Sequence, residues 1–263
     1  MCRWALWSGQ PVYIEDLILT PAHSLIHQSR AAHSCKTTVN GDGFGIAWYD
    51  SRPEPGIYKD VRPAWSDPNL AQIARQVRAR LFMAHVRAST GTATSHANCH
   101  PFSYGPLCFM HNGQIGGFNA IRRRLEQTIP DDAYRERHGS TDSEALFLAA
   151  CGDGLDRDPL GAMARTVARF EDLSRQHGAT PHMRFTACWS DGTRSFAARY
   201  ASDALAPSLF WQRRPGGVLV VSEPLDDAPG TWTEVDPGSV LEISGADIAF
   251  HRFCPRSALD RAA

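Results

Sequence analysis

Cys2 is the residue whose position suggests the most specific chemistry, because it directly follows the initiator Met1. Aminopeptidases generally remove an initiator methionine when the second side chain is small, which would leave Cys2 with a thiol and a free α-amine on one carbon. A model α-amine has a pKa of about 7.7 to 8.0, so it is a base near neutral pH that can activate the thiol. The pair predicts nucleophilic catalysis at the N-terminus, and a frayed, inert terminus is the alternative.

Three other positions stand out because polar residues follow apolar runs or begin a helix. Arg87 follows the apolar run 81–86, Asn112-Gly113 follows the run 107–110, and Asp142 begins a run of helical character. Taken singly, they read as a solvated strand end, a hairpin turn and a helix cap. None of the three predicts a function by itself.

The elements that must hold these residues include several buried strands. The apolar-rich segment 2–7 reads as a strand that starts at the chain terminus, and the runs 81–86 and 107–110 read as two more. A glycine-dense turn within 40–49 leads into a further apolar strand. Its glycines precede a strand and lack the spacing of a dinucleotide fingerprint, so nucleotide binding is not predicted.

Capping residues predict where the helices begin. A small polar residue or an aspartate, often followed by proline, is typical of a helix start. The expected helices cover 22–29 after Thr20-Pro21, 68–77 after Asp67, 118–127, a segment from 142 after Ser140-Thr141, and 159–177 between Asp158 and Gly178.

Short β-rich runs replace helices from residue 183 onward. The expected strands cover 183–189, 195–200, 208–211, 218–222 and 239–243, and Asp191-Gly192 is a hairpin signal. Strands, then helices, then strands again favour an α+β layered domain over regular βαβ alternation. We therefore expect a single domain over 2–255.

The composition is that of an ordinary globular protein and excludes several functional classes. The 263 residues are 43% hydrophobic and 21% charged, with a formal net charge of −1. No long basic run indicates a nucleic-acid partner. No run approaches the roughly 20 apolar residues of a membrane span and no leader is recognisable, so we expect a cytoplasmic protein without membrane contact. The seven cysteines lack C-x-x-C spacing, which favours buried thiols over a disulfide framework.

A metal site is an alternative chemistry for this chain. The candidate ligands would be His85, His96, Cys99, His100 and His111. Their spacing matches no standard zinc pattern, so neither a metal nor another cofactor is expected.

Five segments, in the same order and at the same spacing, resemble the class II glutamine amidotransferases. They are Cys2, NGDGFGI at 40–46, HVRASTG at 85–91, HNG at 111–113 and GSTDSE at 139–144. Within the family, PAHSLI at 21–26 and NCHPF at 98–102 are similar to small free-standing members, which include a glutathione-degradation amidotransferase subunit and an ergothioneine-pathway γ-glutamyl hydrolase. The resemblance implies a four-layer αββα sandwich of the N-terminal nucleophile hydrolases, with two mostly antiparallel sheets.

The resemblance also implies a role for each unusual residue. The catalytic residues would be Cys2, Asn112 and Gly113, and the substrate-binding residues would be Arg87, Thr90 and Asp142. The thiol would attack the γ-carbonyl of a γ-glutamyl amide and form a thioester, while the amide group and the glycine N–H stabilise the oxyanion. The arginine fork suits an α-carboxylate, and the aspartate suits an α-ammonium. Strand alternation would turn Arg3 away from the site, so Arg3 is not expected to activate the thiol.

The substrate class is expected to be wider than glutamine. Synthetase-linked members usually carry R-W-A-T-H-G, whereas Gly91 replaces that histidine here, which argues against glutamine as the sole substrate. The small-molecule substrate would be glutamine or a γ-glutamyl peptide, and a partner subunit or a homo-oligomer stays open. The alternative is a catalytically silent γ-glutamyl-binding or regulatory subunit. Intact mass separates the two, because a catalyst must lose Met1.

Overall fold

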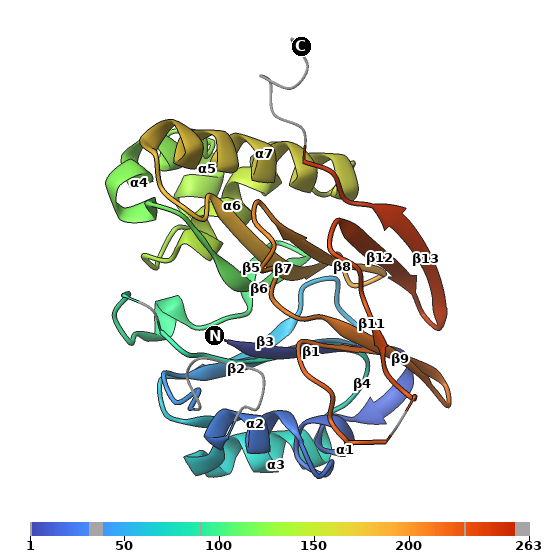
Figure 1. Ribbon diagram of the computed structural model, residues 1–263. Helices are drawn as coiled ribbons and strands as arrows, with labels where there is room; N and C mark the ends of the chain where they lie inside the picture. The colour runs from blue at the N-terminus through green and yellow to red at the C-terminus, as the bar shows by residue number, and fades with distance from the viewer. Residues whose placement is uncertain (1, 32–38, 90, 229, 256–263) are drawn as a thin grey trace.

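Two stacked sheets between two groups of helices make up the protein (Figure 1). The computed structural model describes residues 2–31, 39–89, 91–228 and 230–255, so Met1 and Thr90 lie outside the described residues. One group of helices lies below the first sheet and the other lies above the second. The expected four-layer αββα arrangement is confirmed.

The first sheet has seven strands in the order β11-β9-β10-β1-β4-β2-β3. They are β11 (Thr233–Glu234), β9 (Phe210–Arg214), β10 (Gly217–Val221), β1 (Arg3–Tyr13), β4 (Arg78–Val86), β2 (Phe44–Tyr49) and β3 (Gly56–Asp60). Its outer face is covered by α1 (Glu15–Ile18), α2 (Leu25–Arg30) and α3 (Pro68–Gln76). Because β1 pairs with β10 on one side and β4 on the other, Cys2 lies at the start of the central strand.

The second sheet has six strands in the order β13-β12-β8-β7-β6-β5. They are β13 (Asp247–Arg252), β12 (Ser239–Ser244), β8 (Arg194–Ala201), β7 (Met183–Ser190), β6 (Leu107–Ile115) and β5 (Phe102–Tyr104). Above it lie α4 (Phe118–Glu126), α5 (Asp131–Tyr134), α6 (Asp142–Gly152) and α7 (Pro159–His177). The pairings within both sheets are antiparallel.

Side-chain alternation along β1 divides its residues between two cores. Trp4 and Leu6 pack between the sheets, whereas Ala5 and Trp7 pack against the lower helices. The Trp4 indole N–H donates to the Thr186 carbonyl oxygen on β7 at 3.4 Å, which links the two sheets. The nucleophile candidate therefore leads a strand that is buried on both faces.

Most of the expected helices begin where the capping residues in the sequence predict. In the three helices that begin at the expected caps, the side chains of Asp67, Thr141 and Asp158 accept hydrogen bonds from the first turn. The helix expected over 22–29 instead begins at Leu25, because the Ser24 hydroxyl accepts the His27 N–H and caps it there. The Thr20-Pro21 signal was therefore wrong by one turn.

Three strand expectations need correction. Asn112 and Gly113 do not form a turn, because β6 continues through them and pairs them with Thr186 and Phe185. The strand expected over 208–211 is displaced to β9. Neither β3 nor β13 was expected, since both lie at sheet edges without a buried apolar face.

None of the helices in the described part of the chain has the length and apolar character that crossing a membrane requires.

Candidate active site

One cavity of about 240 Å³ opens where the ends of β1, β4, β6 and α6 meet. All expected site residues except Thr90, which lies outside the described residues, line it together. The lining includes Cys2, Arg87, Asn112, Gly113 and Asp142. Two sheets and one helix thus bring into one cavity residues that lie far apart in the chain.

Cys2 directs its thiol toward the loop after β4. The Cys2 Sγ lies 3.6 Å from the Ala88 carbonyl oxygen. Burial raises the pKa of the Cys2 thiol, so the neutral form is favoured near pH 7. A nucleophile in this position needs a base within reach to become a thiolate.

Arg3 faces away from the cavity and holds the start of β1. Its Nη2 lies 2.8 Å from the Glu223 carboxylate, and its Nη1 donates to the Cys2 carbonyl oxygen at 3.3 Å. Trp4 N donates to Ser222 Oγ at 2.9 Å, a contact between residues 218 positions apart. The segment after β10 therefore anchors the N-terminal strand, and Arg3 lies on the face opposite the cavity, as alternation predicted.

Arg87 lies at the end of β4 and is 3% exposed. Its Nη1 donates to the Asp42 carbonyl oxygen at 3.2 Å. Its Nη2 donates to Thr92 Oγ1 at 2.6 Å and to the Ala93 carbonyl oxygen at 3.3 Å. The guanidinium therefore orders the loop that follows it while it also lines the cavity.

Asn112 carries an unsatisfied buried donor into the cavity. Its side chain is 1% exposed, and its Nδ2 has no hydrogen-bond acceptor among the residues that the structure describes. Buried polar groups in proteins nearly always have partners, so an orphaned amide in the cavity that the Cys2 thiol also lines indicates a ligand position. At the neighbouring Gly113, a Cβ would collide with the Arg184 carbonyl oxygen, so only glycine fits there.

Asp142 begins α6, where two backbone N–H donors orient its carboxylate. Its Oδ2 accepts the Ile115 N–H at 2.9 Å, which ties α6 to the end of β6. Its Oδ1 accepts from Ser143 N at 2.8 Å. The carboxylate is partly exposed and still lines the cavity, so it can accept a further donor from a ligand.

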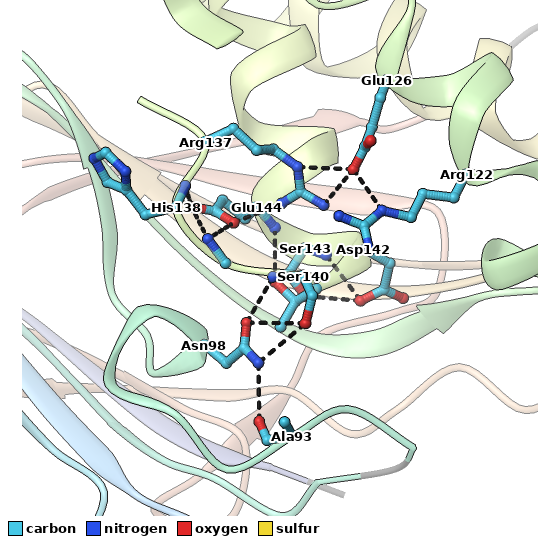
Figure 2. Close-up of polar contacts among 12 residues, drawn as sticks. Ala93, Asn98, Arg122, Glu126, Arg137, His138, Ser140, Asp142, Ser143 and Glu144 are labelled. Atoms are coloured by element: carbon cyan, nitrogen blue, oxygen red, sulfur yellow. Dashed lines mark hydrogen bonds and ion pairs between the residues drawn. The ribbon is translucent and has the colours of Figure 1, made fainter. Parts of the chain in front are cut away.

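A buried polar network supports the segment before Asp142 (Figure 2). Glu144 accepts the backbone N–H groups of His138 and Gly139 and pairs with Arg137 at 2.5 Å. Arg137 also contacts Glu126 on α4 at 2.7 Å. Sequence reasoning assigned no role to these residues, because contacts between α4, α6 and a loop have no local signal.

The histidines near the cavity are neutral. Burial lowers the pKa of His85 to about 3, and it holds the pKa of His100 well below its ordinary value. The two rings stack with centroids 4.2 Å apart. His111 Nε2 lies 3.1 Å from the Arg184 carbonyl oxygen and must carry the proton, so its Nδ1 is left to accept from Ser143 Oγ at 2.9 Å. No group of three possible metal ligands gathers among the described residues.

Two antiparallel sheets between helix layers, with a cysteine leading the central strand, define the αββα class of N-terminal nucleophile hydrolases. The sequence-family model of the class II glutamine amidotransferases matches residues 20–215 of this chain. The chain is 35% identical to the probable glutamine amidotransferase DUG3 of Saccharomyces cerevisiae, over 95% of this chain and 84% of that protein. It belongs to the class II glutamine amidotransferase family.

Other relatives agree with this membership. The chain is 28% identical to the gamma-glutamyl-hercynylcysteine sulfoxide hydrolase of Mycolicibacterium smegmatis, over 94% of this chain and 98% of that one. A glutamine aminotransferase class-II domain protein from Silicibacter pomeroyi has a solved structure that matches with a TM-score of 0.78 at 45% identity, over 97% of this chain and all of that one. The B. subtilis glutamine phosphoribosylpyrophosphate amidotransferase, at 17% identity and a TM-score of 0.58, shares the fold and is covered over 50% of its length.

Proposed function

We propose that this protein is an N-terminal cysteine amidohydrolase that cleaves the amide of a γ-glutamyl compound through a γ-glutamyl thioester. The observation that carries the proposal is the orphaned Nδ2 of Asn112 in the cavity that Cys2 lines. A donor buried without a partner is suited to an oxyanion, because it loses no existing hydrogen bond when negative charge develops on the substrate oxygen.

The first half of the reaction uses the α-amine that Met1 removal exposes. The amine takes the thiol proton, and Sγ forms a bond to the γ-carbonyl carbon. When the tetrahedral intermediate collapses, the C–N bond breaks and the leaving amine takes the proton. Water then attacks the thioester, the C–S bond breaks, and glutamate leaves as the thiol regains its proton.

The oxyanion that forms in both halves would be bound by the Asn112 amide together with the Gly113 backbone N–H. Loss of one such donor typically lowers kcat by about 10²- to 10³-fold. The raised pKa of the Cys2 thiol supports the role of the amine, since it makes spontaneous thiolate formation unfavourable near pH 7.

The glutamyl head would lie between Arg87 and Asp142. The arginine supplies a planar fork for the α-carboxylate, and the aspartate supplies the counter-charge for the α-ammonium. Thr90, which lies outside the described residues, is proposed as a further substrate-binding residue. Both charges lie on backbone segments fixed by hydrogen bonds, which suits recognition of the one substrate part that all γ-glutamyl compounds share.

The relatives favour γ-glutamyl compounds with a leaving group larger than ammonia. One of them is named as a hydrolase of gamma-glutamyl-hercynylcysteine sulfoxide, which carries a substituted amine after the glutamyl group. We extend that substrate class, but no single compound, to this protein. A partner subunit or a second copy of the chain that receives the product is a further part of the proposal.

The experiment compares processed protein with protein that retains Met1. Hydrolysis of glutamine, glutathione and other γ-glutamyl peptides is followed by glutamate release, and intact mass reports the state of the N-terminus. Processed protein should be active, whereas protein with Met1 or an N-terminal tag and the Cys2→Ala variant should be inactive while folded. Full activity with a blocked N-terminus would sink the proposal.

A further inference from the structure

Asn98 lies between the segment that follows Arg87 and the segment that precedes Asp142, the two residues proposed to bind the glutamyl head. Its side chain forms hydrogen bonds to both segments (Figure 2). It belongs to a short 3-10 turn, His96–Asn98, and is 2% exposed. Its Nδ2 donates to the Ala93 carbonyl oxygen at 2.8 Å, and its Oδ1 accepts from Ser140 N at 2.7 Å. Burial protects both contacts from competition with water.

The Ala93 end of this connection leads directly to Arg87. The carbonyl oxygen that accepts from Asn98 also accepts from Arg87 Nη2 at 3.3 Å. The same nitrogen bonds to Thr92 Oγ1 at 2.6 Å. The position of the Arg87 guanidinium therefore depends on where this loop is held.

The Ser140 end leads to Asp142. Thr141 caps α6 through the Glu144 N–H at 3.2 Å, and Asp142 follows it at the first helical position. The close packing needs glycine at 139, because a Cβ there would lie 2.6 Å from Asn98 Oδ1. One side chain thus joins the loop after β4 in the first sheet to the start of α6 above the second.

We propose that Asn98 is a positioning residue that sets the separation of Arg87 and Asp142, and so selects ligands with both an α-carboxylate and an α-ammonium. The inference rests on the proposed function of the cavity. Two charges recognise one ligand well only when their spacing is fixed beforehand, since otherwise part of the binding free energy is lost in ordering them. Asn98 itself does not line the cavity.

The test uses binding, so it does not depend on turnover. In a Cys2→Ala background, calorimetry measures Kd for L-glutamine and for glutaramic acid, which keeps the carboxylate and side-chain amide but lacks the α-ammonium. Asn98→Asp keeps the acceptor for Ser140 N but puts an acceptor opposite the Ala93 carbonyl, and Asn98→Ala removes both contacts. The control Asn69→Asp makes the same change at an exposed position on α3.

Both Asn98 variants should weaken glutamine binding roughly tenfold, as expected for the loss of one or two buried hydrogen bonds. Glutaramic acid should bind weakly to the parent and to each variant, and its Kd should change little. The ratio of the glutaramic acid Kd to the glutamine Kd should therefore fall in the Asn98 variants. Unchanged glutamine affinity would overturn the inference, and so would an equal loss for both ligands, which indicates general damage.

The proposed function is tested separately, by turnover of the processed wild-type protein. Absence of turnover together with a narrowed ligand preference would refute the activity and retain the role of Asn98. If the Cys2→Ala parent does not bind glutamine, the role of Asn98 is overturned, whereas the proposed function is still decided by turnover of γ-glutamyl compounds by the processed protein.

Discussion

Asn112 and Gly113 are neighbours on β6, yet different constraints act on them. The alternation of the strand turns the Asn112 side chain toward the sheet interface, where its amide lines the cavity without an acceptor among the described residues. At position 113, the Arg184 carbonyl oxygen leaves no room for a Cβ. The glycine is therefore explained by packing alone, whereas the orphaned amide is not.

Asn112→Ala should lower kcat by about 10²- to 10³-fold with little change in KM, because an oxyanion donor acts mainly in the transition state. Steady-state kinetics on any γ-glutamyl substrate that the wild-type protein turns over would check this. Asn69→Ala is the control. A rise in KM alone would assign Asn112 to ground-state binding.

Asp142→Asn should chiefly raise KM, because a charge that binds the head group acts in ground and transition states alike. The neutral side chain can still accept the Ile115 N–H, so the start of α6 should stay in place. The measurement compares KM for glutamine and N-acetylglutamine. Comparable hydrolysis of glutamine and N-acetylglutamine by the wild-type protein would show that Asp142 does not recognise the α-ammonium group.

At the scale of elements, the start of β1 depends on the segment that follows β10. Arg3 is fully buried and pairs with Glu223, and Ser222 bonds to Trp4 on the same strand. The Gln28 side-chain amide of α2 donates to the Glu223 carbonyl oxygen at 3.2 Å and extends the contact. Cys2 therefore precedes a strand whose first residues are held by contacts with residues near the other end of the chain.

Glu223→Gln should lower the free energy of unfolding by about 3 to 5 kcal/mol, because it leaves the buried Arg3 charge without its counter-ion. Urea unfolding checks the value. The control is Glu234→Gln, which breaks the Arg199 pair at a carboxylate whose side chain is 55% exposed. That change should cost less than about 1 kcal/mol. Equal losses in both variants would contradict the expectation.

At the scale of the whole molecule, the space between the sheets contains neutral histidines. His85 on β4 stacks on His100, and His100 packs on Phe102 of β5 with ring centroids 4.5 Å apart. Burial is the main cause of their lowered pKa values, and the nearby charge of Arg87 adds to it. Protonation of either ring therefore opposes the stacking of the two sheets.

Stability should fall as the pH drops from about 6.5 toward 3, since the unfolded chain then binds protons that the folded His85 excludes. The slope contributed by each such histidine is at most about 1.4 kcal/mol per pH unit. Urea unfolding of His85→Gln at pH 7, 6 and 5 should show a shallower pH dependence than wild type. His138→Gln, at a side chain that is 68% exposed, should leave the slope unchanged.

Much of the architecture was predictable because its signals are local. Caps at Asp67, Thr141 and Asp158 act within one helical turn, so the sequence alone locates these helix starts. The apolar runs that form β1, β4 and β7 indicate buried strands directly. The edge strands β3 and β13 escaped prediction because they bury no apolar face. The family resemblance also predicted that Cys2, Arg87, Asn112, Gly113 and Asp142 belong to one site, and these residues line the cavity.

The sequence alone supplies the chemical groups of the cavity: a thiol at position 2, an arginine, an amide and a carboxylate on separate elements. How these groups are held depends on the folded structure. The contact of Arg3 with Glu223, the pairing of Arg137 with Glu144, and the two bonds of Asn98 join segments that have no fixed spacing along the chain. Such contacts depend on how the sheets stack and where the loops cross, so no local pattern of residues can encode them.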